Sequence, residues 1–281
     1  MPPRPVEFVR FWLTAVLVHN AGMCTLSWLR DENGYDLFFN RDEKRSRPAA
    51  KPPELHRVGS TSVLAPVDGA AGGSWLAANE HGLTVALLNG YADAGAAAPD
   101  GGWTSRGHLV LGLSDCATVA ELEGRLRTTQ LASFRSFHLA AFDLQTASLA
   151  SWRDGSLVRI DGDSFKAPLI SSSYRYEEVS ESRRARFRQF AATGGSRVET
   201  MLAYHRSHHP ERGAYSTCMH REDARTVSFA WIRVDTCEVR MRYCPDSPCR
   251  GWPPGSPLVL STSSANAHAR AAPRDRSSTN R

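Results

Sequence analysis

The chain has 281 residues, of which 41% are hydrophobic, enough for the core of one large domain or two small ones. Its net charge of +5 lies mostly at the ends, because residues 262–281 carry three net positive charges and residues 1–22 carry one. The nearly neutral remainder has no basic stripe with interleaved aromatic residues, which argues against a nucleic-acid partner. No apolar run is long enough for a transmembrane segment.

Residues 1–22 allow three interpretations. Arg4 and Arg10 precede a short apolar run at 11–18, as in a secretory signal peptide. The residues just before Cys24 are also similar to a lipoprotein cleavage site, although Met23 fits that pattern poorly. In the third interpretation they are an extension from a wrongly chosen upstream start, and the functional chain begins at Met23.

The next segment predicts a β-hairpin. Residues 24–29 alternate between apolar and small side chains, Asn33-Gly34 is a hairpin turn signal, and residues 35–39 predict the returning strand. The turn brings Cys24, at the start of one strand, close to Asn40–Asp42, at the end of the other. These segments can therefore form one site although they are separated in the sequence.

Cys24 is the candidate nucleophile of that site. If Met23 is removed, Cys24 carries a free α-amine, with a reference pKa of about 7.7–8.0, and a thiol with one of about 8.5. The amine can then take the proton of the thiol near neutral pH, so one residue is nucleophile and base. The alternative is a buried structural cysteine.

Arg41 and Asp42 are predicted to assist Cys24. Asp42 would hold the α-ammonium, and Arg41 would lower the pKa of the thiol. Neighbouring strand residues point to opposite faces, so Asn40 and Asp42 share a face that Arg41 reaches only past a bulge or at the strand end. The alternative for Arg41 is a surface ion pair with Asp42 or Glu43.

The rest of the chain predicts an α+β fold. Pro48, Pro52 and Pro53 predict a loop, as do residues 94–102, and Thr118–Glu121 is a capping box that opens a helix. Further predicted elements are strands at 75–79, 83–88, 137–143, 148–153, 157–160, 226–234 and 237–243, and helices at 182–192 and 197–207, separated by Gly194-Gly195. This order indicates a layered α+β domain at 23–261, followed by a disordered basic tail at 262–281.

Two further residues are candidates for the site. Asn89 ends a predicted strand before Gly90, where its amide can donate to an oxyanion, or can simply belong to a turn. Arg221 precedes the final hairpin, and we expect it to bind substrate together with Asn40.

The six cysteines are interpreted as reduced, and the buried ones as structural. A zinc site built from Cys237, Cys244 and Cys249 with His205, His208 and His209 is the less favoured alternative, because the spacing matches no standard signature. We therefore expect no metal and no cofactor.

Three sequence blocks resemble the NRDE-domain family, the transport and Golgi organisation protein 2 family, over about residues 23–250. The blocks are Met23-Cys24-Thr25 with Phe39-Asn40-Arg41-Asp42-Glu43 and Arg47-Pro48, then Gly72-Gly73-Ser74-Trp75-Leu76 with Gly82-Leu83 and Ala86-Leu87-Leu88-Asn89, and finally Ser105-Arg106-Gly107. The family is distantly similar to N-terminal nucleophile (Ntn) hydrolases of the choloylglycine hydrolase type, which cleave amides with an N-terminal cysteine. The resemblance implies their four-layer αββα sandwich and favours a functional start at Met23.

The resemblance also implies roles for single residues. In the related hydrolases an Asn at the place of Asn89 stabilises the oxyanion, and a second Asn often comes later, where this chain has Ser171-Ser172-Ser173. Those enzymes usually have Arg and Asp three residues apart, whereas Arg41 and Asp42 are adjacent.

Three functions remain open. The first is an Ntn-type cysteine amidohydrolase or acyltransferase acting on a non-peptide C–N bond of a small-molecule amide. The second, which the family implies, is a non-catalytic protein that binds or traffics a lipid-like or haem-like ligand, with Cys24 or a histidine as the axial ligand of haem. The third is a secreted, disulfide-bonded protein in which Cys24 is structural. The expected location is cytoplasmic, or secreted if residues 1–22 are a signal peptide.

Overall fold

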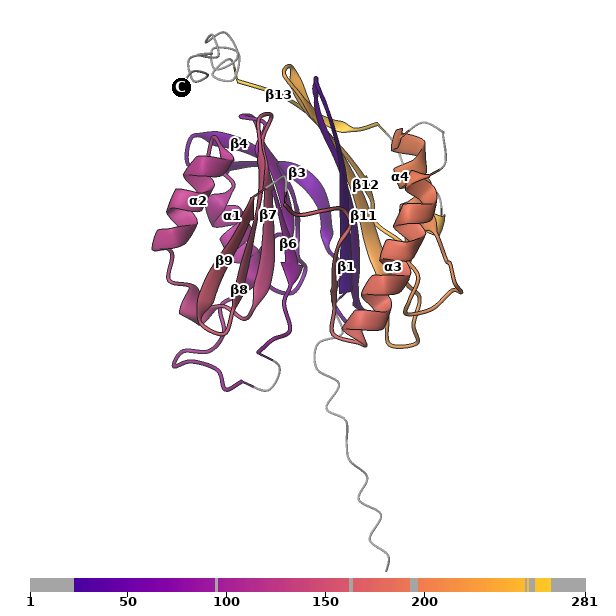
Figure 1. Cartoon of the computed structure of the whole chain (residues 1–281). Coiled ribbons are helices and arrows are strands. Elements are labelled where there is room, and N and C mark those ends of the chain that lie inside the picture. The colour runs from indigo at the N-terminus through magenta and orange to yellow at the C-terminus, as the bar shows by residue number, and fades with distance from the viewer. Residues whose placement is uncertain are drawn as a thin grey trace, which may run out of the picture.

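The structure, a computed structural model, describes residues 23–93, 96–161, 164–192, 197–250, 252 and 256–263. Two antiparallel sheets pack face to face (Figure 1). The first has the order β10 (Leu169–Ser172), β1 (Met23–Asp31), β2 (Gly34–Lys44), β11 (Ala224–Asp235), β12 (Glu238–Cys244) and β13 (Leu258–Ser261). The second runs in chain order: β3 (Lys51–Val58), β4 (Thr61–Val67), β5 (Leu76–Asn79), β6 (Thr84–Asn89), β7 (Phe137–Phe142), β8 (Ala147–Arg153) and β9 (Ser156–Asp161).

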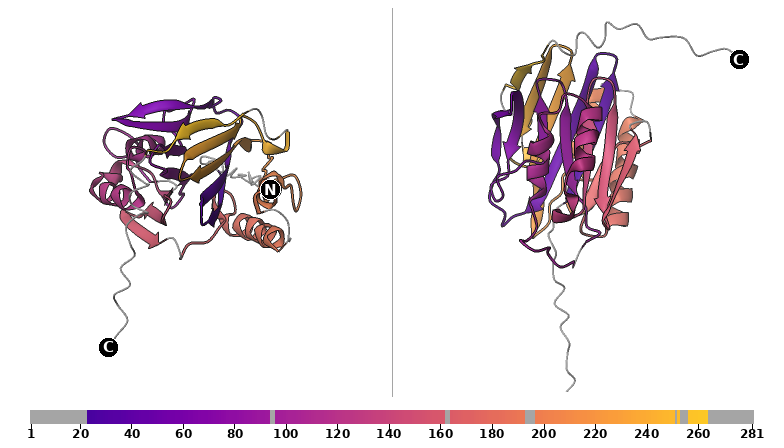
Figure 2. Two further views of the ribbon diagram at one scale, coloured as in Figure 1. Left: turned by 90° about the horizontal axis from the view of Figure 1, so that it is seen from above. Right: turned by 90° about the vertical axis from the view of Figure 1, so that its left-hand side faces the viewer.

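Helices cover the outer face of each sheet. α1 (Arg106–Leu113) and α2 (Val119–Thr128) lie on the seven-stranded sheet, and α3 (Tyr176–Ala191) and α4 (Arg197–Arg206) lie on the six-stranded sheet (Figures 1 and 2). Short 3₁₀ turns lie at η1 (Leu131–Ser133) and η2 (Pro248–Arg250). The layers are helix, sheet, sheet and helix, which confirms the α+β, four-layer αββα sandwich.

Each interface between layers has its own apolar core. Tyr35, Leu37 and Phe39 meet Leu88 and Phe142 between the two sheets. Other clusters fill the space under α1 and α2, and under α3 and α4. Because β2 is buried on both faces, its residues reach two of these layers.

The Asn-Gly turn of the first hairpin is confirmed. β1 ends at Asp31 and β2 begins at Gly34, whose φ of 151° favours glycine. A Cβ at Gly34 would lie 1.9 Å from the carbonyl oxygen of Val234 on β11, so no larger residue fits. The turn fixes a register in which Cys24 lies opposite Arg41 and Met23 lies opposite Asp42.

The helix predicted from the Thr118–Glu121 signature also forms, although the Glu121 carboxylate accepts from the Ala117 amide and not from that of Thr118. Thr118 accepts a hydrogen bond from the Glu121 amide at 3.1 Å and opens α2. The predicted helix at 182–192 begins earlier, at Tyr176, and the helix at 197–207 ends one residue sooner, at Arg206. The proposed break at Gly194-Gly195, the extension 1–22 and the tail from 264 onward lie outside the described residues, as do positions 94 and 95 of the predicted loop.

The prediction of a loop around the prolines was wrong for Pro52 and Pro53. Both lie in β3, which is an edge strand whose pairing with β4 shifts register between Lys51 and Glu54. Proline lacks an N–H donor, and an edge strand with a bulge is where a sheet tolerates that loss. The elements β3, β4, β10, β13 and α1 had no counterpart among the predicted elements.

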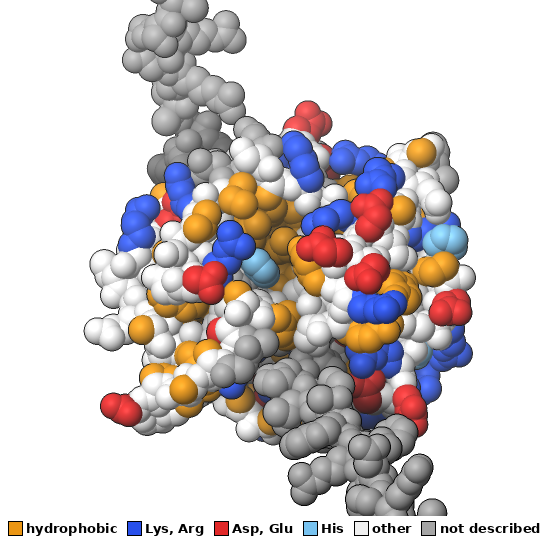
Figure 3. All heavy atoms as spheres, turned by 60° about the horizontal axis from the view of Figure 1, so that its bottom comes forward, with side chains coloured by type: hydrophobic (Ala, Val, Ile, Leu, Met, Phe, Trp, Pro, Cys, Tyr) orange, Lys and Arg blue, Asp and Glu red, His pale blue; other side chains and the backbone are white. Residues whose placement is uncertain are grey.

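Basic and acidic side chains are interspersed on the face shown in Figure 3, in keeping with the nearly neutral body of the sequence. None of the helices in the described part of the chain has the length and apolar character needed to cross a membrane.

Candidate functional site

A cavity of about 290 Å³ opens beside Cys24. Its lining comes from β1, β2 and the segment after β2 on one side, and from the segment between β4 and β5, the end of β6 and the start of α1 on the other. The lining residues are Cys24, Arg41, Glu43, Lys44, Ser46, Arg47, Pro48, Asp68, Ala70, Ser74, Trp75, Leu87, Asn89, Ser105, Arg106 and Gly107. All three blocks that carry the family resemblance therefore meet at one cavity.

Cys24 is almost buried at this cavity, with 7% of its surface exposed. Burial raises the pKa of its thiol to about 12, and the nearby Asp42 carboxylate adds to the rise. In a chain that retains residues 1–23, the Cys24 nitrogen is a peptide nitrogen and cannot act as a base. The thiol of the extended chain is therefore held protonated.

Arg41 lies on the same face as Cys24, because the two are register partners on adjacent strands. Its guanidinium lies 4.1 Å from the centre of the Trp75 ring and pairs with Asp68 and, at 3.5 Å, with Glu43. Arg47 also binds Asp68, at 2.8 Å. The expected bulge is not needed, since strand alternation alone places Arg41 in the cavity.

Asp42 points to the opposite face of β2. Its carboxylate is buried against α3, where Arg183 donates to it at 3.1 Å and the Thr226 hydroxyl donates at 2.6 Å. Burial raises the pKa of Asp42 to about 6, and the charge of Arg183 opposes this rise. Asp42 still lies beside the site, because it is the register partner of Met23, which adjoins Cys24.

Asn40 shares that helix-facing side and does not line the cavity. Its amide nitrogen donates to the carbonyls of His205 and Thr217 at 2.9 and 2.8 Å, and its amide oxygen accepts from the His205 ring at 3.1 Å. The side chain of Asn40 thus docks the end of α4, through His205, and the later segment at Thr217 on β2.

Arg221 also lies away from the cavity lining. Its guanidinium lies 4.7 Å from the centre of the Tyr174 ring and forms an ion pair with Asp223 at 2.9 Å. We therefore leave Asn40 and Arg221 out of the candidate site.

Asn89 is brought to the cavity by the end of β6. Its side chain is hydrogen-bonded to Tyr91, whose hydroxyl is buried close to Cys24, and burial raises the pKa of Tyr91 well above its ordinary value. Ser171 on β10 is the register partner of Cys24 on its other side. The Ser171 hydroxyl is buried and has no hydrogen-bond partner within the described part of the chain.

Arg106 begins α1 at the far wall of the cavity. It donates to the Ser136 carbonyl at 2.7 Å, and burial lowers the pKa of its guanidinium. The wall is closed by direct backbone contact, since a Cβ at Gly73 would lie 2.4 Å from the carbonyl carbon of Gly107. The Ser74 amide donates to the Gly107 carbonyl at 3.1 Å across the same contact.

The sequence of residues 23–238 matches the profile of the Transport and Golgi organisation 2 family. The chain belongs to this family. The match includes every residue that lines the cavity. Among curated proteins, no sequence matches the chain.

Similar solved structures include two single-residue variants of the conjugated bile acid hydrolase from Clostridium perfringens. One variant is 11% identical to this chain, with a TM-score of 0.43, and the other is 12% identical, with a TM-score of 0.45. Each match covers 85% of this chain and 96% of the hydrolase. The Caenorhabditis elegans orthologue of N-acylethanolamine-hydrolyzing acid amidase is 10% identical, with a TM-score of 0.48, over 85% of this chain and 99% of that one.

Most residues around the cavity of this Transport and Golgi organisation 2 family member were not predicted as site residues, and Asp68, Trp75, Tyr91 and Arg106 are among them. Trp75 and Arg106 belong to the sequence blocks that carry the family resemblance, so membership of these blocks could have identified them as site residues. Asp68 and Tyr91 lie in no such block, and only the packing of the two sheets brings them to Cys24.

Proposed function

We propose that the chain is a cysteine amidohydrolase of the Ntn type, which cleaves a small non-peptide amide once Cys24 is its N-terminal residue. The observation that carries the proposal is the position of Cys24, at the start of β1, opposite Arg41 and on the wall of a cavity. The family match supports it, because the matched region starts one residue before Cys24.

Removal of residues 1–23 changes the chemistry of Cys24. The new α-ammonium takes the place of the Met23 peptide group, next to the register partner Asp42. With a pKa of about 6, Asp42 is mostly ionised at pH 7 and can hold this ammonium in place. The added positive charge, with Arg41, favours the thiolate, so the pKa of the thiol falls from its value in the extended chain.

The reaction then follows from the groups at hand. The α-amine accepts the thiol proton, and Sγ attacks the amide carbon to form a tetrahedral intermediate. Asn89 and the Ser171 hydroxyl are the donors proposed for its oxyanion. The ammonium gives its proton to the leaving nitrogen, the amine departs, and a thioester remains. Water attacks the thioester, which releases the carboxylic acid and restores Cys24.

The lining of the cavity supports a small polar substrate. Four cations, namely Arg41, Lys44, Arg47 and Arg106, face two carboxylates, Glu43 and Asp68. An amide with a carboxylate or another anionic group matches this excess of positive charge. A cavity of about 290 Å³ lined this way suits a haem-like or lipid-like ligand poorly, and none of the described residues that line it is a histidine.

The test compares a chain that starts at Cys24, verified by intact mass, with one that retains residues 1–22. Both are assayed on small N-acyl amides with and without a carboxylate. We expect hydrolysis only by the shorter chain, and loss of it in the variant Cys24→Ala. Cys237→Ser is the control, because this thiol is exposed in the turn between β11 and β12.

Equal turnover by both chains, or an active Cys24→Ala variant, would refute the mechanism. If neither chain turns over any amide but both bind haem in an absorbance titration, the ligand-binding alternative replaces it.

A further inference from the structure

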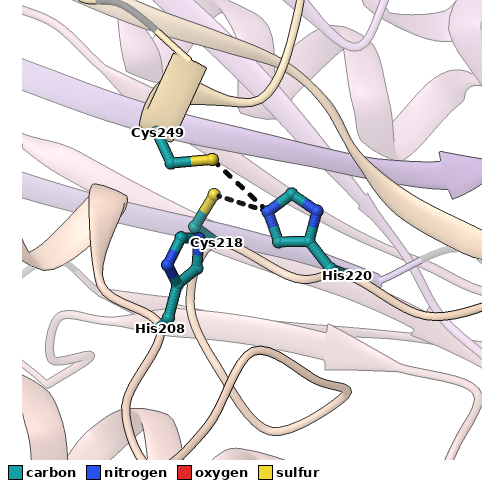
Figure 4. A group of neighbouring side chains, drawn as sticks. All are labelled: His208, Cys218, His220 and Cys249. Carbon is teal, nitrogen blue, oxygen red and sulfur yellow. Dashed lines mark hydrogen bonds between the residues drawn. The ribbon is translucent and has the colours of Figure 1, made fainter.

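Four side chains converge far along the chain from Cys24. They are His208, Cys218, His220 and Cys249, and one potential ligand atom of each lies within 4.8 Å of those of the other three. They come from three segments: the loop after α4, the loop before β11, and η2 (Figure 4). Figure 4 shows the two thiols and the His220 ring pointing toward one another, with the His208 ring beside them.

The distances within this cluster fit a tetrahedral metal site. Nε2 of His220 lies 3.5 Å from Sγ of Cys218 and 3.4 Å from Sγ of Cys249. In a tetrahedral zinc site with Zn–N and Zn–S bonds of about 2.1 and 2.3 Å, a nitrogen–sulfur edge is about 3.6 Å. The rings of His208 and His220 have their centres 5.1 Å apart, which leaves room for both to reach one ion.

Hydrogen bonding alone explains the cluster poorly. A neutral imidazole nitrogen either donates one proton or accepts along one lone pair, so Nε2 of His220 satisfies only one of its two sulfur neighbours well. Nε2 of His208 is buried and has no hydrogen-bond partner among the described residues. A cation at the centre would satisfy both thiolates and one nitrogen of each ring.

We propose that His208, Cys218, His220 and Cys249 bind a structural Zn²⁺ ion. The donor set is Cys₂His₂, with four protein ligands and no open coordination position, as in zinc sites that stabilise a fold. The soft thiolates together with imidazoles select zinc over magnesium or calcium. The ion would join η2 to the loop that follows α4.

The proposed metal site is connected to Asp42 through two hydrogen bonds. Cys218 and His220 flank Met219, whose backbone amide donates to the Thr226 hydroxyl at 2.8 Å. That hydroxyl in turn donates to Asp42 at 2.6 Å. Holding both neighbours of Met219 on one ion therefore fixes Thr226, and through it the carboxylate beside the start of β1.

The sequence contained part of this signal. His208 and Cys249 belong to the zinc alternative considered from the sequence, but its other members lie elsewhere. Cys237 is exposed, Cys244 lies in the core opposite Phe229, and His205 is bound to Asn40. The spacing Cys-x-His with one distant ligand on each side matches no standard signature, so only the folded chain brings the four together.

The metal content of the purified chain from residue 23 onward tests the proposal. We expect about one zinc per chain by elemental mass spectrometry, and a large loss in Cys249→Ser and in His220→Gln. The matched controls are Cys237→Ser and His209→Gln, which remove an exposed thiol and the exposed neighbour of His208 and should keep the zinc.

Cobalt provides a measurement that does not depend on the variants folding. Co²⁺ added to the metal-free native chain should give tetrahedral ligand-field bands and thiolate-to-cobalt charge-transfer absorption, and Zn²⁺ should abolish both. Removal of zinc by a chelator should lower Tm, and its return should restore Tm.

Three results would overturn the proposal. These are a native chain that takes up neither zinc nor cobalt, equal zinc in the ligand variants and the native chain, and a non-reduced peptide map that shows a Cys218–Cys249 disulfide. None of these results depends on amide hydrolysis, so the metal site and the proposed enzyme activity fail or stand separately.

Discussion

At the scale of single residues, the state of the Cys24 nitrogen decides which thiol reacts first. While residues 1–22 are present, burial holds the pKa of Cys24 near 12, so iodoacetamide should label the exposed Cys237 first. When Cys24 is N-terminal, it should become the most rapidly labelled cysteine. Peptide mapping after limited labelling measures both rates. Equal labelling of Cys24 in the two chains would contradict the proposed activation.

Asn89 is expected to act on the transition state. Loss of one oxyanion donor typically lowers turnover about 10²–10³-fold, so Asn89→Ala should lose that much activity with little change in Tm. Asn79→Ala is the contrasting variant, because its buried amide donates to the carbonyls of Ser114 and Cys116 at 2.8 and 2.7 Å. That variant should lose stability instead. Unchanged turnover in Asn89→Ala would reduce Asn89 to a turn residue.

The sequence predicted the positions of those site residues that the first β-hairpin determines. The Asn33-Gly34 turn fixes the register of the hairpin, and this register was enough to bring Cys24 beside Arg41. The alternation rule correctly separated Asp42 from Arg41. It could not say that Asn40 would be saturated by His205 and Thr217, because those partners follow 165 and 177 residues later.

At the scale of elements, the docking of α4 on the first hairpin should be sensitive to acid. His205, near the end of α4, accepts from the Ser27 hydroxyl at 2.8 Å and donates to Asn40 at 3.1 Å. Burial, with the charge of Arg183, lowers the pKa of His205 to about 3. The imidazole ring of His205 is therefore neutral in the folded chain at neutral pH, and its protonation destabilises the fold.

This pKa shift has a definite sign. Between pH 3 and about 6.5 the unfolded chain binds the His205 proton and the folded chain does not, so stability falls as the pH falls through this range. At pH 5 the loss should be about 2 kcal/mol relative to pH 8. Urea unfolding should show a smaller loss in His205→Gln, and the exposed His209→Gln should behave as the native chain. If the native chain and both variants lose the same unfolding free energy between pH 8 and pH 5, His205 is not the source of the acid sensitivity.

The close contact between α1 and the loop before β5 gives a second prediction for an element. A Cβ on Gly107 would lie 2.9 Å from the Ser74 nitrogen, so Gly107→Ala must displace α1 and the adjacent Arg106. We expect a loss of about 1–3 kcal/mol in stability, measured by urea unfolding, and a loss of activity. Gly112→Ala in the same helix has nothing within 4 Å of the new methyl and should gain about 0.5–1 kcal/mol. A neutral Gly107→Ala would refute the tight contact.

Elements with a strong local signal were predicted better than elements formed by tertiary pairing. The start of α2 at Thr118 and the Asn-Gly hairpin depend on residues a few positions apart, and both formed as expected. β3 depends on its neighbour β4, so its prolines were mistaken for a loop. β10 has four residues and forms only because β1 offers an edge.

At the scale of the whole molecule, we expect the tail to be dispensable, with a boundary slightly later than residue 261. The Thr262 amide donates to the Cys237 carbonyl at 2.9 Å, and the Ser263 amide donates to the Glu80 carbonyl at 2.7 Å. We therefore expect truncation after Ser263 to leave Tm unchanged, because residues 264–281 offer little apolar surface to bury. Calorimetry of the truncated chain measures this, and a drop of several degrees would show that the tail packs on the domain.

The strand order of the six-stranded sheet also sets the order in which the molecule can fold. The β1–β2 hairpin is synthesised first but lies between β10 and β11, and Asp42 and its partner Thr226 are 184 residues apart. At a synthesis rate of about 5–20 residues per second, the hairpin waits roughly 10–40 s for these neighbours. Until β10 and β11 are made, the two edges of the hairpin lack the neighbouring strands that they have in the folded sheet. The hairpin that carries Cys24 therefore spends part of synthesis with two open strand edges, which a chaperone on the ribosome can shield from aggregation.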